Sequence, residues 1–310
     1  MAISMGIGLG SYPFSSPAQF WRWIELCENS ELDSLWQSDR LISTHAILEP
    51  MSMMAALAGA TKRIKFGMNA VVLAYRHPVM LAKQCATIDY LSNGRLLPCF
   101  GIGGGAAPEW EAADINPRQR GARANESLQI MSLLWQQDHV DFDGEFFRLR
   151  NASIEPKPVQ QKLPLWVGGS SQAAIVRTAR FGTGWIAGLQ GPEKVAETIA
   201  GIKAALESEQ RHIADDHYGA TLLYRFEAPG AKTTKGDAAR RANSNEAQSI
   251  TATGGAEQIL ALVQQYIDAG ASKFVAIPLA DSDQDMLDQT RRLIDEVLPE
   301  LAKKNRKRWG

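Results

Sequence analysis

The sequence predicts an α/β protein built as a single (β/α)8 TIM barrel over residues 1–310. Short β-like runs alternate with helical patterns almost throughout, eight such units fit within the chain, and no Pro/Gly/Ser linker divides it. The runs with strand character are 6–10, 34–38, 64–69, 96–101, 165–168, 184–187, 219–226 and 273–278. A doubly wound open sheet is the alternative arrangement of the same units.

Helical segments with recognisable beginnings lie between these runs. Ser16 before Pro17 is typical of an N-cap followed by proline at the first helical position. Phe20, Trp23 and Cys27 then fall on one face. The other helical patterns occupy 49–60, 78–91, 118–135, 172–181, 192–210, 256–269 and 285–303. Each follows a strand, as βα units require.

Two segments are longer than normal loops, and we expect them as insertions. Residues 136–164 follow the fourth helix and contain a hairpin-like stretch at 140–147. Residues 227–255 follow the seventh strand and are polar. Long loops on a compact fold often serve as lids, so both are candidates to cover a site.

Composition excludes several classes of function. The formal net charge of −1 gives no general attraction to nucleic acid or to an anionic membrane. The N-terminus lacks a basic stretch before an apolar segment, and no apolar run reaches the roughly 18 residues of a membrane span. The cysteines and histidines have no metal-binding spacing. We therefore expect a cytoplasmic protein with no metal and no nucleic-acid or membrane partner.

Glycine-rich loops follow the fourth and fifth predicted strands, at 101–106 and 168–171. Without Cβ atoms, backbone N–H groups in such loops can turn toward an anion. The second loop adds the N-terminus of the helix that begins near Gln172, where a phosphate is favoured by the helix dipole. A plain tight turn is the alternative for the first loop. If both bind, they could share one phosphate.

Common nucleophile and dinucleotide motifs are missing. No G-x-S-x-G elbow occurs. The glycines at 6–10 lie inside the first strand, so they do not form the G-x-G-x-x-G turn of a Rossmann site. The phosphate would then belong to another cofactor or to the substrate. In a parallel barrel it would lie at the carboxyl ends of the strands.

Several ordered segments together resemble the bacterial luciferase-like flavin and deazaflavin oxidoreductases, over roughly residues 1–280. The segments that carry the resemblance are SLWQSDR at 34–40, RHP at 76–78, LSNGR at 91–95, 101–105, RANE at 123–126, FDGEFF at 142–147, PKP at 156–158, LPLWVGG at 163–169 and GTGW at 182–185. An ordered series of this kind is far more specific than any one motif.

The resemblance implies a (β/α)8 barrel that binds FMN or the deazaflavin coenzyme F-420 at the carboxyl mouth. It also implies a non-proline cis peptide bond between Asn69 and Ala70, behind the flavin ring. The implied cofactor contacts are Ser38, Asn69, Ala70, Gly103, Gly104, Gly105, Gly168, Gly169 and Ser170. The implied catalytic residues are Asp39, Arg40 and Trp36, with Tyr12 and Trp185 in the substrate pocket.

Each of these roles has a structural alternative. Trp36 and Trp185 sit where barrel strands also bury side chains, so core packing is the alternative for both. Arg40 could contact Asp39 or Glu49 instead of an anion. His45 is a further candidate proton donor, although a lone loop histidine is more often a surface residue.

Two departures from the family pattern narrow the expected activity. Many deazaflavin-dependent members have Asp-His at the end of strand two, where this chain has Asp39-Arg40. The deazaflavin-dependent sugar-phosphate dehydrogenases have an acid after the strand-four glycines, where this chain has Ala106. That sugar-phosphate activity is therefore not expected.

The resemblance implies an oxidoreductase that carries out hydride transfer or monooxygenation on a small organic substrate. FMN and the deazaflavin are implied about equally. The implied partners are a flavin reductase that supplies reduced cofactor and a second copy of the chain in a homodimer. The alternative is a non-catalytic flavin-binding protein of the same fold.

Overall fold

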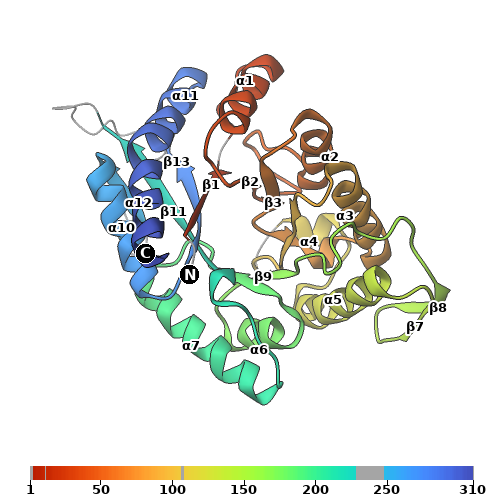
Figure 1. Ribbon diagram of the computed structural model, residues 1–310. Coiled ribbons are helices and arrows are strands. Elements are labelled where there is room, and N and C mark those ends of the chain that lie inside the picture. The colour runs from red at the N-terminus through yellow and green to blue at the C-terminus, as the bar shows by residue number, and fades with distance from the viewer. Residues whose placement is uncertain (1–2, 11, 106–107, 228–247, 310) are drawn as a thin grey trace.

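A curled parallel sheet surrounded by helices forms the centre of the molecule in the computed structural model (Figure 1), which describes residues 3–10, 12–105, 108–227 and 248–309. The strands of the sheet are β1 (Ser4–Leu9), β2 (Ser34–Gln37), β3 (Lys65–Met68), β4 (Val71–Val72), β5 (Leu96–Leu97), β6 (Cys99–Gly101), β9 (Trp166–Gly168), β10 (Gly184–Ile186), β11 (Tyr218–Phe226), β12 (Thr251–Gly254) and β13 (Lys273–Pro278). All their pairings are parallel. The fold is therefore α/β, as predicted, with every predicted strand present.

Strand pairing follows chain order around the sheet. Strand β1 lies between β13 and β2, with Ile7 opposite both Ala276 and Leu35. The predicted strand 96–101 is broken into two pieces, β5 and β6, and β4 is a further short strand beyond the predicted 64–69, which β3 matches. Pro98 explains the break, because it has no N–H to donate to the ladder. Strand β3 pairs with β5, and β4 pairs with β6.

The helices lie on the outside of the sheet (Figure 1). They are α1 (Pro17–Glu28), α2 (Pro50–Ala60), α3 (Pro78–Ser92), α4 (Glu109–Ala112), α5 (Arg120–Gln136), α6 (Gln172–Phe181), α7 (Pro192–Ser208), α10 (Ala256–Asp268), α11 (Asp283–Arg292) and α12 (Leu298–Trp309). Ser16 caps α1 by accepting from the Gln19 N–H, as expected. The predicted helix 285–303 is interrupted by a π-helical turn, Leu293–Val297, between α11 and α12.

The first insertion contains the predicted hairpin. Strands β7 (Val140–Asp143) and β8 (Arg148–Ala152) pair antiparallel, and Figure 1 shows them beyond α5 at the edge of the molecule. The Glu126 carboxylate accepts hydrogen bonds from the N–H groups of Glu145, Phe146 and Phe147, which ties the hairpin turn to α5. Most of the second insertion, residues 228–247, lies outside the described residues; its described end includes β12, a strand that the sequence did not predict.

A charge cluster that includes the buried Lys273 lies at the amino ends of the strands. Lys273 at the beginning of β13 forms an ion pair with Asp33, and Lys65 lies 3.6 Å from the other Asp33 oxygen. Burial lowers the pKa of Lys273, although the Asp33 carboxylate partly offsets that effect. Burial also opposes ionisation of Asp33, but the two lysines outweigh it and lower the pKa of Asp33. This cluster joins three strands at the end opposite the glycine-rich loops.

Candidate active site

A cis peptide bond between Asn69 and Ala70 lies between β3 and β4, as the resemblance implied. The Asn69 side chain donates to the Thr221 hydroxyl at 2.8 Å, and Thr221 donates to the Ala187 carbonyl at 2.8 Å. These two hydrogen bonds connect the carboxyl side of β3 with β11 and with the end of β10. The backbone at Asn69 is therefore held from across the sheet.

Small residues surround the methyl group of Ala70. A Cβ atom added to Gly101 would lie 3.4 Å from the Ala70 Cβ, and one added to Gly168 would lie 3.8 Å from it. Both glycines end strands, β6 and β9, that pair with each other. The sequence thus leaves three neighbouring strand ends without bulky side chains. A flat ring could approach the backbone there.

The two glycine-rich loops leave from these adjacent strand ends. Cys99 pairs with Trp166 and Phe100 with Val167, so β6 and β9 end side by side. Gly103 and Gly169 adopt φ of 68° and 103°, in the left-handed region that L side chains rarely occupy. The structure therefore brings the two predicted phosphate loops together.

A tryptophan indole anchors each loop through a glycine carbonyl. Trp110 Nε1 donates to the Gly104 carbonyl at 2.7 Å, and Trp185 Nε1 donates to the Gly169 carbonyl at 2.8 Å. In a trans peptide the N–H points opposite to the C=O, so the N–H groups of Gly105 and Ser170 point away from the indoles. Neither N–H donates to any acceptor among the described residues. Both are open donors.

Side chains further define the second loop. The Ser171 hydroxyl caps α6 by accepting from the Ala174 N–H at 3.3 Å. The Ser170 hydroxyl accepts from the Gln190 amide, and the Gln190 carbonyl accepts from the Tyr266 hydroxyl at 2.7 Å. Gln190 was not singled out from the sequence, because no local pattern links it to Ser170, which lies 20 residues earlier in the chain.

Asp39 is engaged in an ion pair. Its carboxylate contacts the Arg76 guanidinium, with Arg76 Nη2 3.1 Å from Oδ1, and accepts from the Val72 N–H at 2.9 Å. Arg76 also contacts Glu49 at 3.1 Å. Burial would lower the pKa of Arg76, but the two carboxylates outweigh it and raise that pKa. Asp39 thus fastens the end of β2 to β4. Arg76 was missed, although its RHP segment belonged to the resemblance.

Arg40 is exposed and makes no hydrogen bond or ion pair with any residue that the structure describes. The two carboxylates considered as its structural partners, Asp39 and Glu49, pair with Arg76 instead. Its charge is therefore free to meet an anionic group. His45 is exposed as well.

The predicted aromatic residues lie deeper than an open pocket would place them. Trp36 is 1% exposed, and its indole donates to the Ser34 hydroxyl at 2.9 Å. Trp185 is fully buried, so it acts on the site through its bond to Gly169. Tyr12 is half-buried and packs its ring 5.0 Å from that of Phe14. Both tryptophans occupy core positions.

Ser38 lies at the end of β2, where its hydroxyl donates to the Leu9 carbonyl at 3.4 Å. This bond connects the carboxyl ends of β1 and β2. Ala106, the position that departs from the sugar-phosphate dehydrogenases, lies outside the described residues.

Glu109 is a buried acid beside the first loop that the sequence did not indicate. It is 3% exposed, and its Oε2 has no hydrogen-bond partner among the described residues. The neighbouring Tyr75 ring lies 4.5 Å from that of Trp110. Burial raises the pKa of Tyr75, and the negative charge of Glu109 is the second cause of this increase. The sequence does not distinguish Glu109 from Glu111, an exposed acid of the same helix, so its burial could not be predicted.

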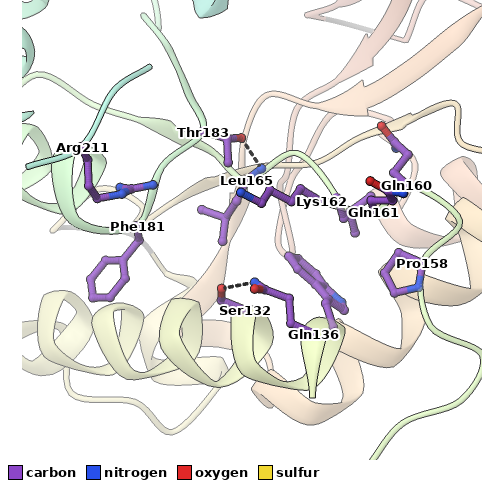
Figure 2. Close-up of a pocket in the computed structure, with 12 residues that line it drawn as sticks. Ser132, Gln136, Pro158, Gln160, Gln161, Lys162, Leu165, Phe181, Thr183 and Arg211 are labelled. Atoms are coloured by element: carbon purple, nitrogen blue, oxygen red, sulfur yellow. Dashed lines mark hydrogen bonds between the residues drawn. The ribbon is translucent and has the colours of Figure 1, made fainter. Parts of the chain in front are cut away.

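A separate cavity of about 230 Å³ lies at the opposite end of the strands (Figure 2). Leu165 and Thr183, which precede β9 and β10, line it and are joined by a hydrogen bond of 2.8 Å. Arg211 in its wall already donates to the carbonyls of Ala179 and Gly182. No lining residue has a buried unpartnered polar atom within the described chain. We therefore place the candidate active site at the glycine-rich loops.

Across the described ranges, no three or more His, Cys, Asp or Glu side chains are grouped so that they could hold a metal ion. Within those same ranges, no helix has the length and apolar character needed to cross a membrane.

The fold and the paired loops define a class of α/β protein with open backbone N–H groups, among the described residues, at the carboxyl edge of a parallel sheet. The chain belongs to the luciferase-like monooxygenase family, which it matches over residues 2–224. It is 24% identical over 315 residues to an F420-dependent glucose-6-phosphate dehydrogenase of Amycolatopsis mediterranei, covering 88% of this chain and 91% of that protein.

Other curated relatives match over a shorter stretch. An uncharacterized protein of Mycobacterium tuberculosis is 31% identical over 163 residues, which cover 52% of this chain and 54% of that protein. Pyrimidine monooxygenase RutA of Pantoea ananatis is 30% identical over 178 residues, which cover 54% of this chain and 47% of that protein. The chain thus spans about half the length of these relatives.

Solved structures confirm the fold class. Monooxygenase RslO1 from Streptomyces bottropensis superposes with a TM-score of 0.82 at 19% identity, covering 96% of this chain and 99% of that one. An F420-dependent secondary alcohol dehydrogenase gives a TM-score of 0.82 at 17% identity, and the match covers 97% of this chain and 99% of that one. At these identities the likeness shows the fold alone.

Proposed function

We propose that this chain is an oxidoreductase that binds FMN or the deazaflavin coenzyme F-420 and acts on a small organic substrate by hydride transfer or monooxygenation. The observation that carries the proposal is the pair of open N–H donors at Gly105 and Ser170, in adjacent loops that indoles anchor from behind. Donors of this kind at the beginning of α6 suit a phosphate. Relatives named as F420-dependent dehydrogenase and monooxygenase support the same class.

We further propose that the sheet forms the complete (β/α)8 barrel of this family as one domain over residues 1–310, with insertions after the fourth helix and the seventh strand. The order of strand pairing supports this arrangement. A homodimer, and a flavin reductase that delivers reduced cofactor, are part of the same proposal.

Different residues of the site have different proposed roles. Gly103 to Gly105 and Gly168 to Ser170 would hold the phosphate, and the space over Ala70 would accept the ring system. When bound, the flavin or deazaflavin supplies the hydride chemistry. The Asn69–Thr221 hydrogen bond fixes backbone that would support the ring, and the guanidinium of Arg40, which has no partner among the described residues, would orient an anionic group on the substrate. Asp39 positions β4 through Arg76 rather than moving a proton.

The non-catalytic alternative is less well supported. A flavin-binding protein without turnover would fill the space beside the ring, and the long loops and all eight strand units expected of an enzyme of this family are retained here. The relatives that are named by activity are enzymes.

The proposal is tested by loading the purified protein with each cofactor, reducing it without oxygen and then mixing it with oxygen. Rapid reoxidation of bound FMN supports a monooxygenase, and a stable reduced deazaflavin that passes hydride to an added acceptor supports a dehydrogenase or reductase. A protein that binds neither cofactor, or whose bound cofactor cannot be reduced, would contradict the proposal.

A further inference from the structure

We infer that this chain selects FMN over the deazaflavin coenzyme, with Arg120 pairing with the terminal phosphate and two acids of the neighbouring groove rejecting a carboxylate tail. The inference rests on the proposed function. FMN ends in a phosphate monoester that carries about 1.5 to 2 negative charges at neutral pH. The deazaflavin coenzyme instead has a singly charged phosphodiester, which continues into a tail of several carboxylates. A site can therefore distinguish the two cofactors by charge at and beyond the phosphate.

Arg120, the first residue of α5, places an uncompensated charge beside the first loop. Its Nη2 lies 3.5 Å from the position that a Cβ of Gly105 would occupy, and its Nη1 donates to the Pro117 carbonyl at 2.7 Å. Its Nε is buried without a hydrogen-bond partner, and no described carboxylate forms an ion pair with it. A buried guanidinium donor without a partner indicates a missing acceptor. The open N–H of Gly105 lies in the same loop.

A second arginine, on α6, lies against the same end of α5. Arg177 on α6 is 5% exposed, and it donates to the Asn125 side chain at 2.8 Å and to the Gly121 carbonyl at 3.4 Å. Burial lowers its pKa, and no carboxylate within the described ranges forms an ion pair with it. Gly121 follows Arg120 directly, so the two guanidinium groups approach the same end of α5. Fixed cations near backbone donors favour the more highly charged phosphate monoester.

The groove that begins at Gly105 has the opposite sign. Its lining includes Glu111, Asp114 and Pro117, and none of its lining residues is basic. Both acids are exposed, and neither forms an ion pair with a described residue. A cofactor tail that left the phosphate along this groove would bring its carboxylates toward two unpaired carboxylates. Like charges placed together disfavour binding, so the groove favours a cofactor that ends at its phosphate.

The test measures the dissociation constants of FMN, riboflavin, coenzyme F-420 and the tail-less, phosphate-free deazaflavin on the purified chain. We expect FMN to bind at least about tenfold more tightly than F-420. Arg120→Ala should weaken FMN binding by about ten- to a hundredfold, the loss expected for a charged hydrogen bond, and leave riboflavin binding unchanged. Arg118→Ala, which removes an exposed charge two residues away, is the matched control and should change neither affinity.

The acids are tested by the double variant Glu111→Lys with Asp114→Lys. It should tighten F-420 binding several-fold and change binding of the tail-less deazaflavin little. Equal or tighter binding of F-420 than FMN to the unaltered chain would overturn the inference and leave the proposed function standing. Equal losses of FMN and riboflavin in Arg120→Ala would show that Arg120 is only structural. Binding of none of the four ligands would overturn the proposed function itself, and the inference with it.

Discussion

Single residues at the loops decide whether the backbone can face an anion. Gly103 and Gly169 supply φ values that other residues rarely adopt, and the indoles of Trp110 and Trp185 fix the two peptide planes that carry the open N–H donors. Gly104 differs from these glycines, because a Cβ added there would meet nothing within 4 Å and its φ is not in the left-handed region. The fold therefore does not require glycine at this position, as expected if the proposed ligand does.

Gly104→Val should leave the free energy of unfolding within about 1 kcal/mol of the original value, because the new side chain enters open space. The same side chain would occupy the phosphate position, so FMN affinity should fall by about tenfold or more. Gly59→Val in α2 is the control, since a Cβ there also meets nothing within 4 Å. Unchanged FMN affinity in Gly104→Val would contradict the assignment of the loop.

Trp110→Phe tests the indole anchor, since it removes the hydrogen bond to Gly104 and keeps most of the ring. We expect a loss of about 1 kcal/mol in stability and a several-fold loss in FMN affinity, because the Gly104 carbonyl is released to turn. Trp135→Phe loses an equivalent indole bond, to the Ala82 carbonyl, away from the loops. Equal FMN affinities in the two variants, measured by fluorescence titration, would refute the anchoring role.

At the scale of elements, ion pairs join strands at both ends of the sheet. Asp39 and Arg76 join β2 to β4 at the carboxyl end, and Asp33 with Lys273 and Lys65 joins the beginnings of β2, β13 and β3. Removing one partner of a buried pair costs more than the pair contributes, because the other charge stays buried without compensation. Lys273, which is 7% exposed, is such a charge.

Asp33→Asn should therefore lower the free energy of unfolding by about 3 kcal/mol at pH 7. The pKa of Asp33 is lowered in the folded state, so its contribution is complete above the ordinary carboxyl pKa of about 3.9 and disappears as the pH falls through the folded value. The difference between the two proteins should accordingly shrink toward pH 3 in urea unfolding.

Asp143→Asn is the control for this experiment. Asp143 pairs with Arg148 and Arg150, but its side chain is 63% exposed, so its loss should cost less than about 1 kcal/mol at any pH. A constant difference for Asp33→Asn between pH 7 and pH 3 would contradict the assigned pKa shift.

Regular elements could be predicted because their signals are local. Ser16-Pro17 marks the beginning of α1, and the predicted bounds 172–181 match α6. The break at Pro98 was missed, since the apolar run continues across it, and the two-residue strand β4 was too short to give a signal of its own. Strand β12 was also missed, because Thr251–Gly254 is polar and short and is stabilised by its parallel neighbour β11.

Two features of the candidate site, the adjacent glycine-rich loops and the cis peptide bond, could be predicted from the sequence. The glycine-rich loops are visible in the sequence directly after predicted strands. The family resemblance implied the cis peptide bond between Asn69 and Ala70. Partners distant in sequence gave no local signal: Arg76 lies 37 residues from Asp39 and Thr221 lies 152 from Asn69. The same limit applies to Arg40. The sequence offered Asp39 and Glu49 as its partners, but both carboxylates pair with Arg76 instead.

At the scale of the whole molecule, the two ends of the sheet have separate tasks. The carboxyl end holds the glycine loops, the open N–H donors and Arg40, which has no partner among the described residues, whereas the amino end holds the Asp33 cluster. The hydrophobic cluster around Trp36 extends to Ala70. In parallel α/β barrels this separation places function at one face and stability at the other. Changes at one end should then leave the task of the other end intact.

This separation predicts that ligand binding and the Asp33 cluster contribute additively to stability. A ligand that binds only the folded chain adds about 2.7 kcal/mol to the free energy of unfolding at a hundred times its dissociation constant. FMN at that ratio should stabilise the original protein and Asp33→Asn by the same amount, within about 0.5 kcal/mol, because distant sites without shared partners add. Gly104→Val, assayed at the same FMN concentration, should lose most of the increment. The stabilisation by FMN is measured by urea unfolding with and without FMN. If it is smaller in Asp33→Asn than in the original protein by more than about 1 kcal/mol, the amino end affects FMN binding and the prediction is wrong.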